Sequence, residues 1–150
     1  MYNTLKFIHV VSMAVWIGGI FTMLTLNRIL TSSGDRALLQ GLSRMGAAMS
    51  MRVFVPAMLV TVITGIGMAQ VGDISFGAKW IIWGIVGVVA SFVLGGILTG
   101  GTARKLGRQM ANGEITPEQA AAMQRRILLY AMINVVLLLS IVWAMVAKPA

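Results

Sequence analysis

The segment WIIWGIVGVVASFVLGGILTGGTA, residues 80–103, contains no charged residue and lies between Lys79 and Arg104. As a helix it is long enough to cross a bilayer core of about 30 Å. Lipid offers no hydrogen-bond partner to an exposed backbone, so a segment that crosses a bilayer in this way must be helical. The segment therefore indicates an integral membrane protein.

Three further segments are uncharged, apolar and bounded by charged residues: residues 7–27, 53–72 and 127–147. Over the whole chain of 150 residues, 58% are hydrophobic and 11% are charged, and the mean hydropathy is +0.88. These values exclude an ordinary soluble domain. We therefore expect one domain, residues 1–150, with an all-α fold in which four membrane-spanning helices form an antiparallel bundle.

The basic residues predict the orientation of this bundle. Nine lie in the two long connections: Arg28, Arg36, Arg44, Arg52, Arg104, Lys105, Arg108, Arg125 and Arg126. Three lie at the other ends of the spans: Lys6, Lys79 and Lys148. The positive-inside rule then places both long connections in the cytoplasm and both termini outside. The net charge of +8 fits contact with the lipid bilayer and its anionic head groups, and no motif indicates nucleic-acid binding.

Local signals predict where the helices begin and end. Thr116, Pro117 and Gln119 form the pattern of a capped helix start, so the fourth helix should begin well before its apolar span. The Asn112–Gly113 pair suits the end of the third helix. Pro56, inside the second helix, predicts a local kink.

The only histidine, His9, lies in the first apolar span. Helical periodicity places it on one face with Met13, Trp16, Ile20, Met23 and Asn27, and we expect this face to point into the bundle. Ionisable groups inside membrane spans are costly and often mark function. A histidine that only bonds a neighbouring carbonyl is the alternative.

An antiparallel arrangement brings other polarisable side chains to the depth of His9. Met68, Trp83 and Met145 lie at similar distances from the ends of their spans. The candidate cofactor-binding residues are therefore His9, Met13, Trp16, Met68, Trp83 and Met145, with His9 as the metal ligand. Each has a simpler alternative, because tryptophans form belts at membrane interfaces and methionines fill gaps in packing.

Small residues recur every four positions in the third span, at Gly87, Ser91, Gly95 and Thr99. Such a stripe is typical of close helix packing in membranes. It would equally leave room for a flat cofactor. The sequence leaves both interpretations open.

Three segments together resemble a bacterial superfamily of four-helix membrane proteins. They are KFIHVVSMAVWIGGIF (6–21), RVFVPAMLVTVITGIGM (52–68) and KWIIWGIVGVVASFVLGGILTGGTARKL (79–106). The superfamily includes the CopD copper-resistance domain, the HemJ-type protoporphyrinogen oxidases and a group of uncharacterised predicted membrane proteins, which the third segment resembles most. The shared pattern is His9, then Trp16, then the Gly18–Gly19 pair.

The resemblance implies a multi-pass protein of the bacterial inner membrane in which His9 ligates haem b. The HemJ-type enzymes also have a basic residue inside a later helix. Here the third span has none in its interior, and Lys79 at its start is the nearest candidate. The CopD-like members instead imply copper handling, and imidazole and thioether ligands suit Cu(I).

Three functions follow as expectations. The first is a haem b protein with a redox or electron-transfer role, in which Met68, Met145, a water molecule or a second chain's His9 lies opposite His9. The second is a copper-binding or copper-transport protein that uses His9, Met13, Met68 and Met145. The third is a cofactor-free structural or assembly subunit. A homo-oligomer or a larger membrane complex fits each of them, and catalytic residues and a substrate are not assigned.

Overall fold

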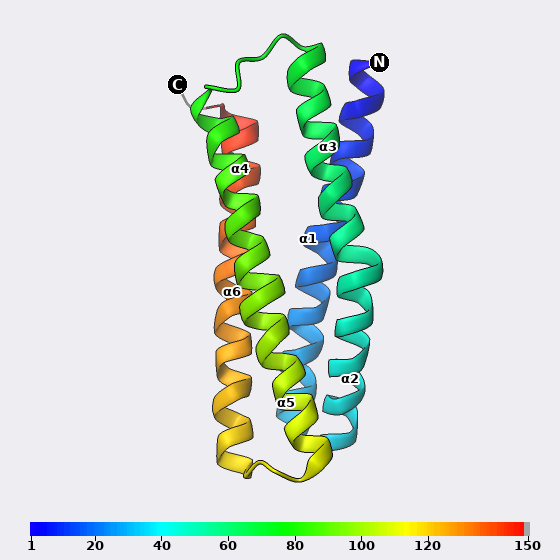
Figure 1. Cartoon of the computed structure of the whole chain (residues 1–150), viewed down its shortest axis with the longest axis vertical. Helices are drawn as coiled ribbons and strands as arrows, with labels where there is room; N and C mark the ends of the chain where they lie inside the picture. The colour runs from blue at the N-terminus through cyan, green and yellow to red at the C-terminus, as the bar shows by residue number, and fades with distance from the viewer. Residues whose placement is uncertain (149–150) are drawn as a thin grey trace.

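The computed structural model describes residues 1–148, without the side chains of Arg36, Leu39, Ser43 and Ala47. The described chain forms a bundle of four long helices (Figure 1). Two of these helices contain a π-helical stretch. In chain order the elements are α1 (Tyr2–Ser33), α2 (Arg36–Met49), η1 (Ser50–Phe54), α3 (Val55–Val71), α4 (Lys79–Ser91), η2 (Phe92–Thr99), α5 (Gly100–Asn112) and α6 (Pro117–Ala147). The second long helix is α2–η1–α3 and the third is α4–η2–α5.

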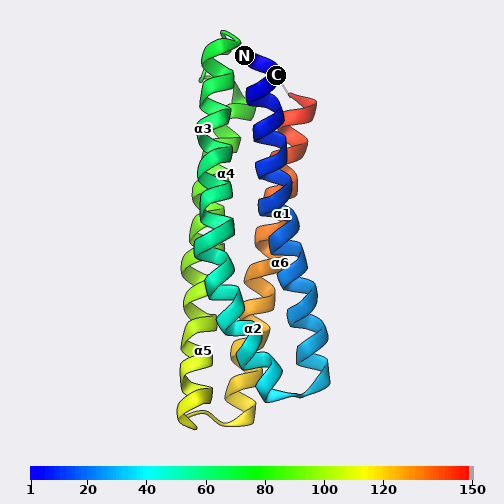
Figure 2. The same ribbon diagram turned by 90° about the vertical axis from the view of Figure 1, so that its right-hand side faces the viewer.

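The predicted all-α antiparallel four-helix bundle is confirmed. Each of the four long helices is long and apolar enough to cross a membrane. Because the number of crossings is even, α1 begins and α6 ends at the same end of the bundle (Figures 1 and 2). We call this end the terminal half, and we call the end with the α1–α2 and α5–α6 connections the loop half. That the terminal half faces outward stays a prediction.

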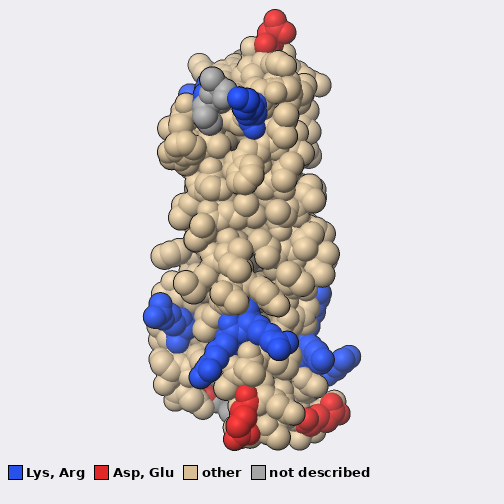
Figure 3. Space-filling model, turned by 90° about the vertical axis from the view of Figure 1, so that its left-hand side faces the viewer, with Lys and Arg blue, Asp and Glu red and all other residues tan. Residues whose placement is uncertain are grey.

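Charge divides the surface in the way that the sequence predicts. On the face seen in Figure 3, basic side chains form a band across the loop half, and an uncharged middle zone separates it from the few charges at the other end. Large apolar side chains such as Phe7, Phe21 and Val136 are exposed on the outside of the bundle. An apolar exterior of this kind is suited to contact with lipid.

The helices pack in a square. α1 lies against α3 and α6, α6 also lies against α4, η2 and α5, and α2 lies against α5. The predicted inward face of α1 is confirmed, since His9 and Trp16 are buried and Met13 and Asn27 are half-buried. The core cluster is centred on Trp16, Leu138 and Ile141.

The predicted helix ends are confirmed. Thr116 caps α6: its hydroxyl accepts from the Gln119 N–H at 3.3 Å, and the Gln119 side chain accepts from the Thr116 N–H at 3.2 Å. Gly113 ends α5 with φ of 68°, a left-handed conformation that suits glycine. These caps satisfy backbone groups that the helix cannot satisfy internally.

Close to Pro56, where the kink was expected, the structure contains the π-helical stretch η1, which lies immediately before α3. The Val55 N–H donates to the Ser50 carbonyl, five residues back. Pro56 has no N–H to continue the usual pattern of hydrogen bonds, so the helix changes pitch here. The second π-helical stretch, η2, contains Gly95 and Gly96 and was not predicted from the sequence.

Candidate functional site

His9 is held against α3 in the terminal half, where its side chain is 7% exposed. Gly65 allows the close approach, because a Cβ atom there would lie 3.2 Å from His9 Cε1. His9 Nδ1 lies 2.9 Å from the Thr61 carbonyl oxygen and 3.2 Å from the Thr64 hydroxyl. The small residues of α3 therefore dock the imidazole ring.

These contacts determine which ring nitrogen carries the hydrogen. The Thr61 carbonyl can only accept, and the Thr64 hydroxyl already donates to the Val60 carbonyl at 2.6 Å. His9 Nδ1 must therefore be the donor in both contacts. In a neutral ring this leaves Nε2 unprotonated, which is the form that ligates metals.

A small cavity of about 20 Å³ adjoins the ring. All four long helices contribute to its wall, which is formed by His9, Met13, Trp16, Ile17, Thr61, Val88, Leu138, Ile141 and Met145. The volume is about that of one water molecule or one metal ion. The wall combines one imidazole with two thioether side chains, and none of its side chains is charged.

The structure brings together four of the six predicted site residues: His9, Met13, Trp16 and Met145 line the small cavity. Met68 is half-buried and lines neither this cavity nor the larger one described below. It lies one helical turn beyond Thr64, toward the end of the bundle. A role for Met68 would therefore have to be exerted from outside the cavity wall.

Trp83 faces outward, with 46% of its surface exposed. Its Nε1 donates to the Ser140 hydroxyl at 3.2 Å on the outside of the bundle. The neighbouring Gly84 faces α6 instead, because a Cβ there would lie 2.7 Å from Met145 Cε. Consecutive helical residues point about 100° apart, so Trp83 turns away from the core. This position suits the alternative of an interfacial tryptophan belt.

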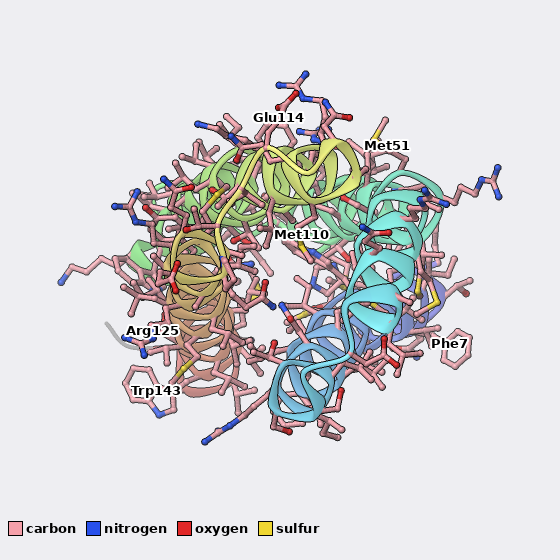
Figure 4. All side chains as sticks on the ribbon, turned by 90° about the horizontal axis from the view of Figure 1, so that it is seen from below. Phe7, Met51, Met110, Glu114, Arg125 and Trp143 are labelled. Carbon is pink, nitrogen blue, oxygen red and sulfur yellow. The ribbon has the colours of Figure 1, made fainter. Side chains whose placement is uncertain are left out.

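A second, larger cavity of about 660 Å³ occupies the loop half. Its wall includes Trp16, Phe54, Ser91, Gly95, Gln124 and Asn134. Trp16 lines both cavities and so separates them. Seen from the loop end, Met110, which lines the large cavity, points toward the middle of the bundle, whereas Phe7, Met51 and Trp143 point outward (Figure 4).

Polar groups in the large cavity fall into two sets. Gln124 Nε2 donates to Asn27 Oδ1 and, at 3.0 Å, to the Thr31 hydroxyl, which ties α6 to α1. Ser91 Oγ and Asn134 Oδ1 are fully buried, yet neither has a hydrogen-bond partner within residues 1–148 as described.

Comparison with known proteins gives one match. A family described as "Predicted integral membrane protein (DUF2269)" matches residues 3–149. The chain belongs to the DUF2269 family. No curated protein and no solved structure matches.

Membership of the DUF2269 family agrees with the four apolar helices and with the predicted-membrane-protein group that the sequence resembles. Within the described part of the chain, no three His, Cys, Asp or Glu side chains are grouped so that they could hold a metal ion. A metal site in this protein would therefore depend on imidazole and thioether ligands.

Proposed function

We propose that this integral membrane protein binds one Cu(I) ion in the small cavity, with His9 Nε2, Met13 and Met145 as ligands. The observation that carries the proposal is the pair of contacts from His9 Nδ1 to Thr61 and Thr64, 2.9 and 3.2 Å long. They engage Nδ1 and leave Nε2 as the nitrogen that would ligate the ion. A second hydrogen bond of this kind is the usual support for a metal-bound histidine.

The chemistry of the cavity wall favours a soft, singly charged ion. Imidazole and thioether ligands suit Cu(I), whereas Ca²⁺, Mg²⁺ and Mn²⁺ prefer oxygen ligands. No carboxylate lines the small cavity to balance a divalent charge. Burying a charge in a membrane span is costly, so the ion with the lowest charge and the softest ligands fits best.

The same cavity does not fit a haem ligated by His9. Its volume of about 20 Å³ accommodates a single atom or ion, not a porphyrin ring. The large cavity has more space, but His9 is not part of its wall. Haem binding at His9 would need the helices around it to separate.

The test is anaerobic titration of the purified protein with Cu(I) against a chromogenic Cu(I) chelator. We expect one Cu(I) per chain and no binding by His9→Ala. Met13→Leu and Met145→Leu keep side-chain volume but remove the sulfur, and each should weaken binding by about tenfold or more. X-ray absorption at the copper edge should show both nitrogen and sulfur ligands.

Met68→Leu is the matched control, because it removes a sulfur from α3 outside the cavity wall. Its Cu(I) affinity should equal that of the unsubstituted protein. Equal losses in Met68→Leu and Met145→Leu would contradict the proposed ligand set. A Soret band in the protein as purified would favour haem. Absence of both cofactors would leave His9 as a structural residue bonded to α3.

A further inference from the structure

We propose that the large cavity is a binding site for an elongated apolar molecule whose buried end carries a neutral hydroxyl group. The proposal concerns the loop half and is independent of copper binding at His9. It depends on the two unpartnered polar atoms in the wall and on the composition of the remaining surface.

Ser91 and Asn134 are each 2% exposed, and both line the large cavity. A buried polar atom without a partner costs free energy, and such atoms are uncommon in native proteins. Ser91 Oγ and Asn134 Oδ1 lack partners in the described part of the chain. Both residues line the cavity while these two atoms are fully buried, so a ligand bonds to them once either side chain rotates toward the cavity.

The two atoms define the chemistry of that ligand. Asn134 Oδ1 only accepts hydrogen bonds, whereas Ser91 Oγ both donates and accepts. A hydroxyl group can donate to Asn134 Oδ1 and can accept from Ser91 Oγ, so it is able to satisfy either atom. A carboxylate has no hydrogen for Asn134, and a hydrocarbon satisfies neither atom. A cation is disfavoured because the described wall contains no Asp or Glu.

Gly95 allows η2 to lie close to Asn134. A Cβ atom at Gly95 would lie 3.1 Å from Asn134 Nδ2, so a larger residue there would press on the amide. Gly95, Gly96 and Thr99 belong to η2, and all three line the cavity. The π-helical stretch and its glycines therefore form the part of the wall beside Asn134.

Size and access fit an amphipathic molecule. The volume of about 660 Å³ lies within the range of sites for drug-sized ligands. The wall extends from the buried Trp16 to Gly113 and Thr116 in the exposed α5–α6 connection. The ligand would therefore enter from the loop end, hydroxyl group first, with its apolar body along Ile20, Met23 and Met58.

The experiment uses the protein in lipid nanodiscs, without copper, and a hexadecanol that carries a diazirine in the middle of its chain. After illumination, mass spectrometry locates the adducts. We expect adducts on residues of the large cavity, and excess unlabelled hexadecanol should suppress them. The matched methyl ether, which cannot donate a hydrogen bond, should label the cavity about tenfold less.

A double comparison isolates the hydrogen bond. Asn134→Leu should reduce cavity labelling by the alcohol about tenfold and remove the difference between alcohol and ether. Ser91→Ala should reduce labelling by the alcohol in the same direction. Ser140→Ala is the control, because it removes a hydroxyl group from α6, the helix of Asn134, at a position outside the cavity. His9→Ala should label as the unsubstituted protein does, which separates this test from that of copper binding.

Equal cavity labelling by alcohol and ether, or adducts only on outward-facing residues, would overturn the proposal. Ala131→Phe gives an independent check, since it fills space in the cavity and leaves both polar atoms in place. It should abolish cavity adducts while the thermal midpoint shows a folded protein. Persistent cavity adducts in this variant would also overturn the proposal.

Discussion

The two halves of the bundle use the same helices in opposite ways. In the terminal half the helices close around His9 and leave a cavity of about 20 Å³, whereas in the loop half they surround about 660 Å³. Both halves present small residues from the third long helix. In the terminal half a side chain at Gly87 would meet Ile141, whereas farther along Gly96 faces the large cavity.

The difference shows that a stripe of small residues does not by itself determine packing. Which side chains lie against the small residues depends on the residues of the facing helix, α6, and on whether the third long helix is α-helical or π-helical at that point. Opposite Gly84 and Gly87, α6 places Met145 and Ile141. Opposite the later part of the stripe, the helix becomes π-helical and α6 places Asn134, so a cavity with polar atoms in its wall results.

Removing the side chain that divides the halves should have the largest effect. Trp16 is buried, and Trp16→Ala would join the two cavities. Truncating a buried aromatic side chain costs about 3–5 kcal/mol. We expect a loss of this size in the free energy of unfolding, measured by denaturant titration in detergent. Trp16→Phe, which keeps most of the wall, should lose clearly less, and equal losses would contradict a dividing role.

A matched pair of glycines in the third long helix tests the comparison directly. A Cβ at Gly87 would collide with Ile141, whereas a Cβ at Gly96 would lie 3.6 Å from the Phe92 ring, an ordinary contact. Overpacking costs about 1–3 kcal/mol, and alanine is the better helix former by about 1 kcal/mol. Gly87→Ala should therefore lower the thermal midpoint, whereas Gly96→Ala should leave it unchanged or raise it. A greater drop in the thermal midpoint for Gly96→Ala than for Gly87→Ala would contradict the conclusion that the helices pack closely in the terminal half and surround a cavity in the loop half.

The smallest expected effect concerns the cap at the mouth of the large cavity. Thr116→Ala removes the side-chain acceptor for the Gln119 N–H and should cost about 1 kcal/mol. Hydrogen exchange should accelerate in the first turn of α6. Thr116→Ser keeps the hydroxyl and serves as the control. Acceleration that extends to Asn134 would show that the loop half depends on this cap more than its geometry indicates.

Much of the fold could be predicted because its signals are local. Uncharged runs locate the spans, Thr116 and Gln119 locate the start of α6, and Gly113 locates the end of α5. The inward face of α1 followed from the spacing of His9 and Trp16. Each of these features depends on neighbouring residues along one helix, which the sequence displays directly.

The site was harder to predict because it depends on the rotation of each helix about its axis. Depth alone grouped Trp83 with His9, although Gly84, one residue on, already indicated that Trp83 points away from the core. The Thr61 and Thr64 contacts to His9 required knowing that α3 packs on α1. No sequence signal located η2, and without it the large cavity could not be inferred from Ser91 and Asn134.

The hydrogen bond from His9 Nδ1 to α3 also makes the protein its own spectroscopic reporter. Since the chain has one histidine, uniform labelling of histidine with nitrogen-15 yields a single pair of ring resonances without any substitution. The bonded nitrogen should resonate as a protonated one and the other as a bare one. Any ion that enters the small cavity would shift the second resonance and leave the first nearly in place.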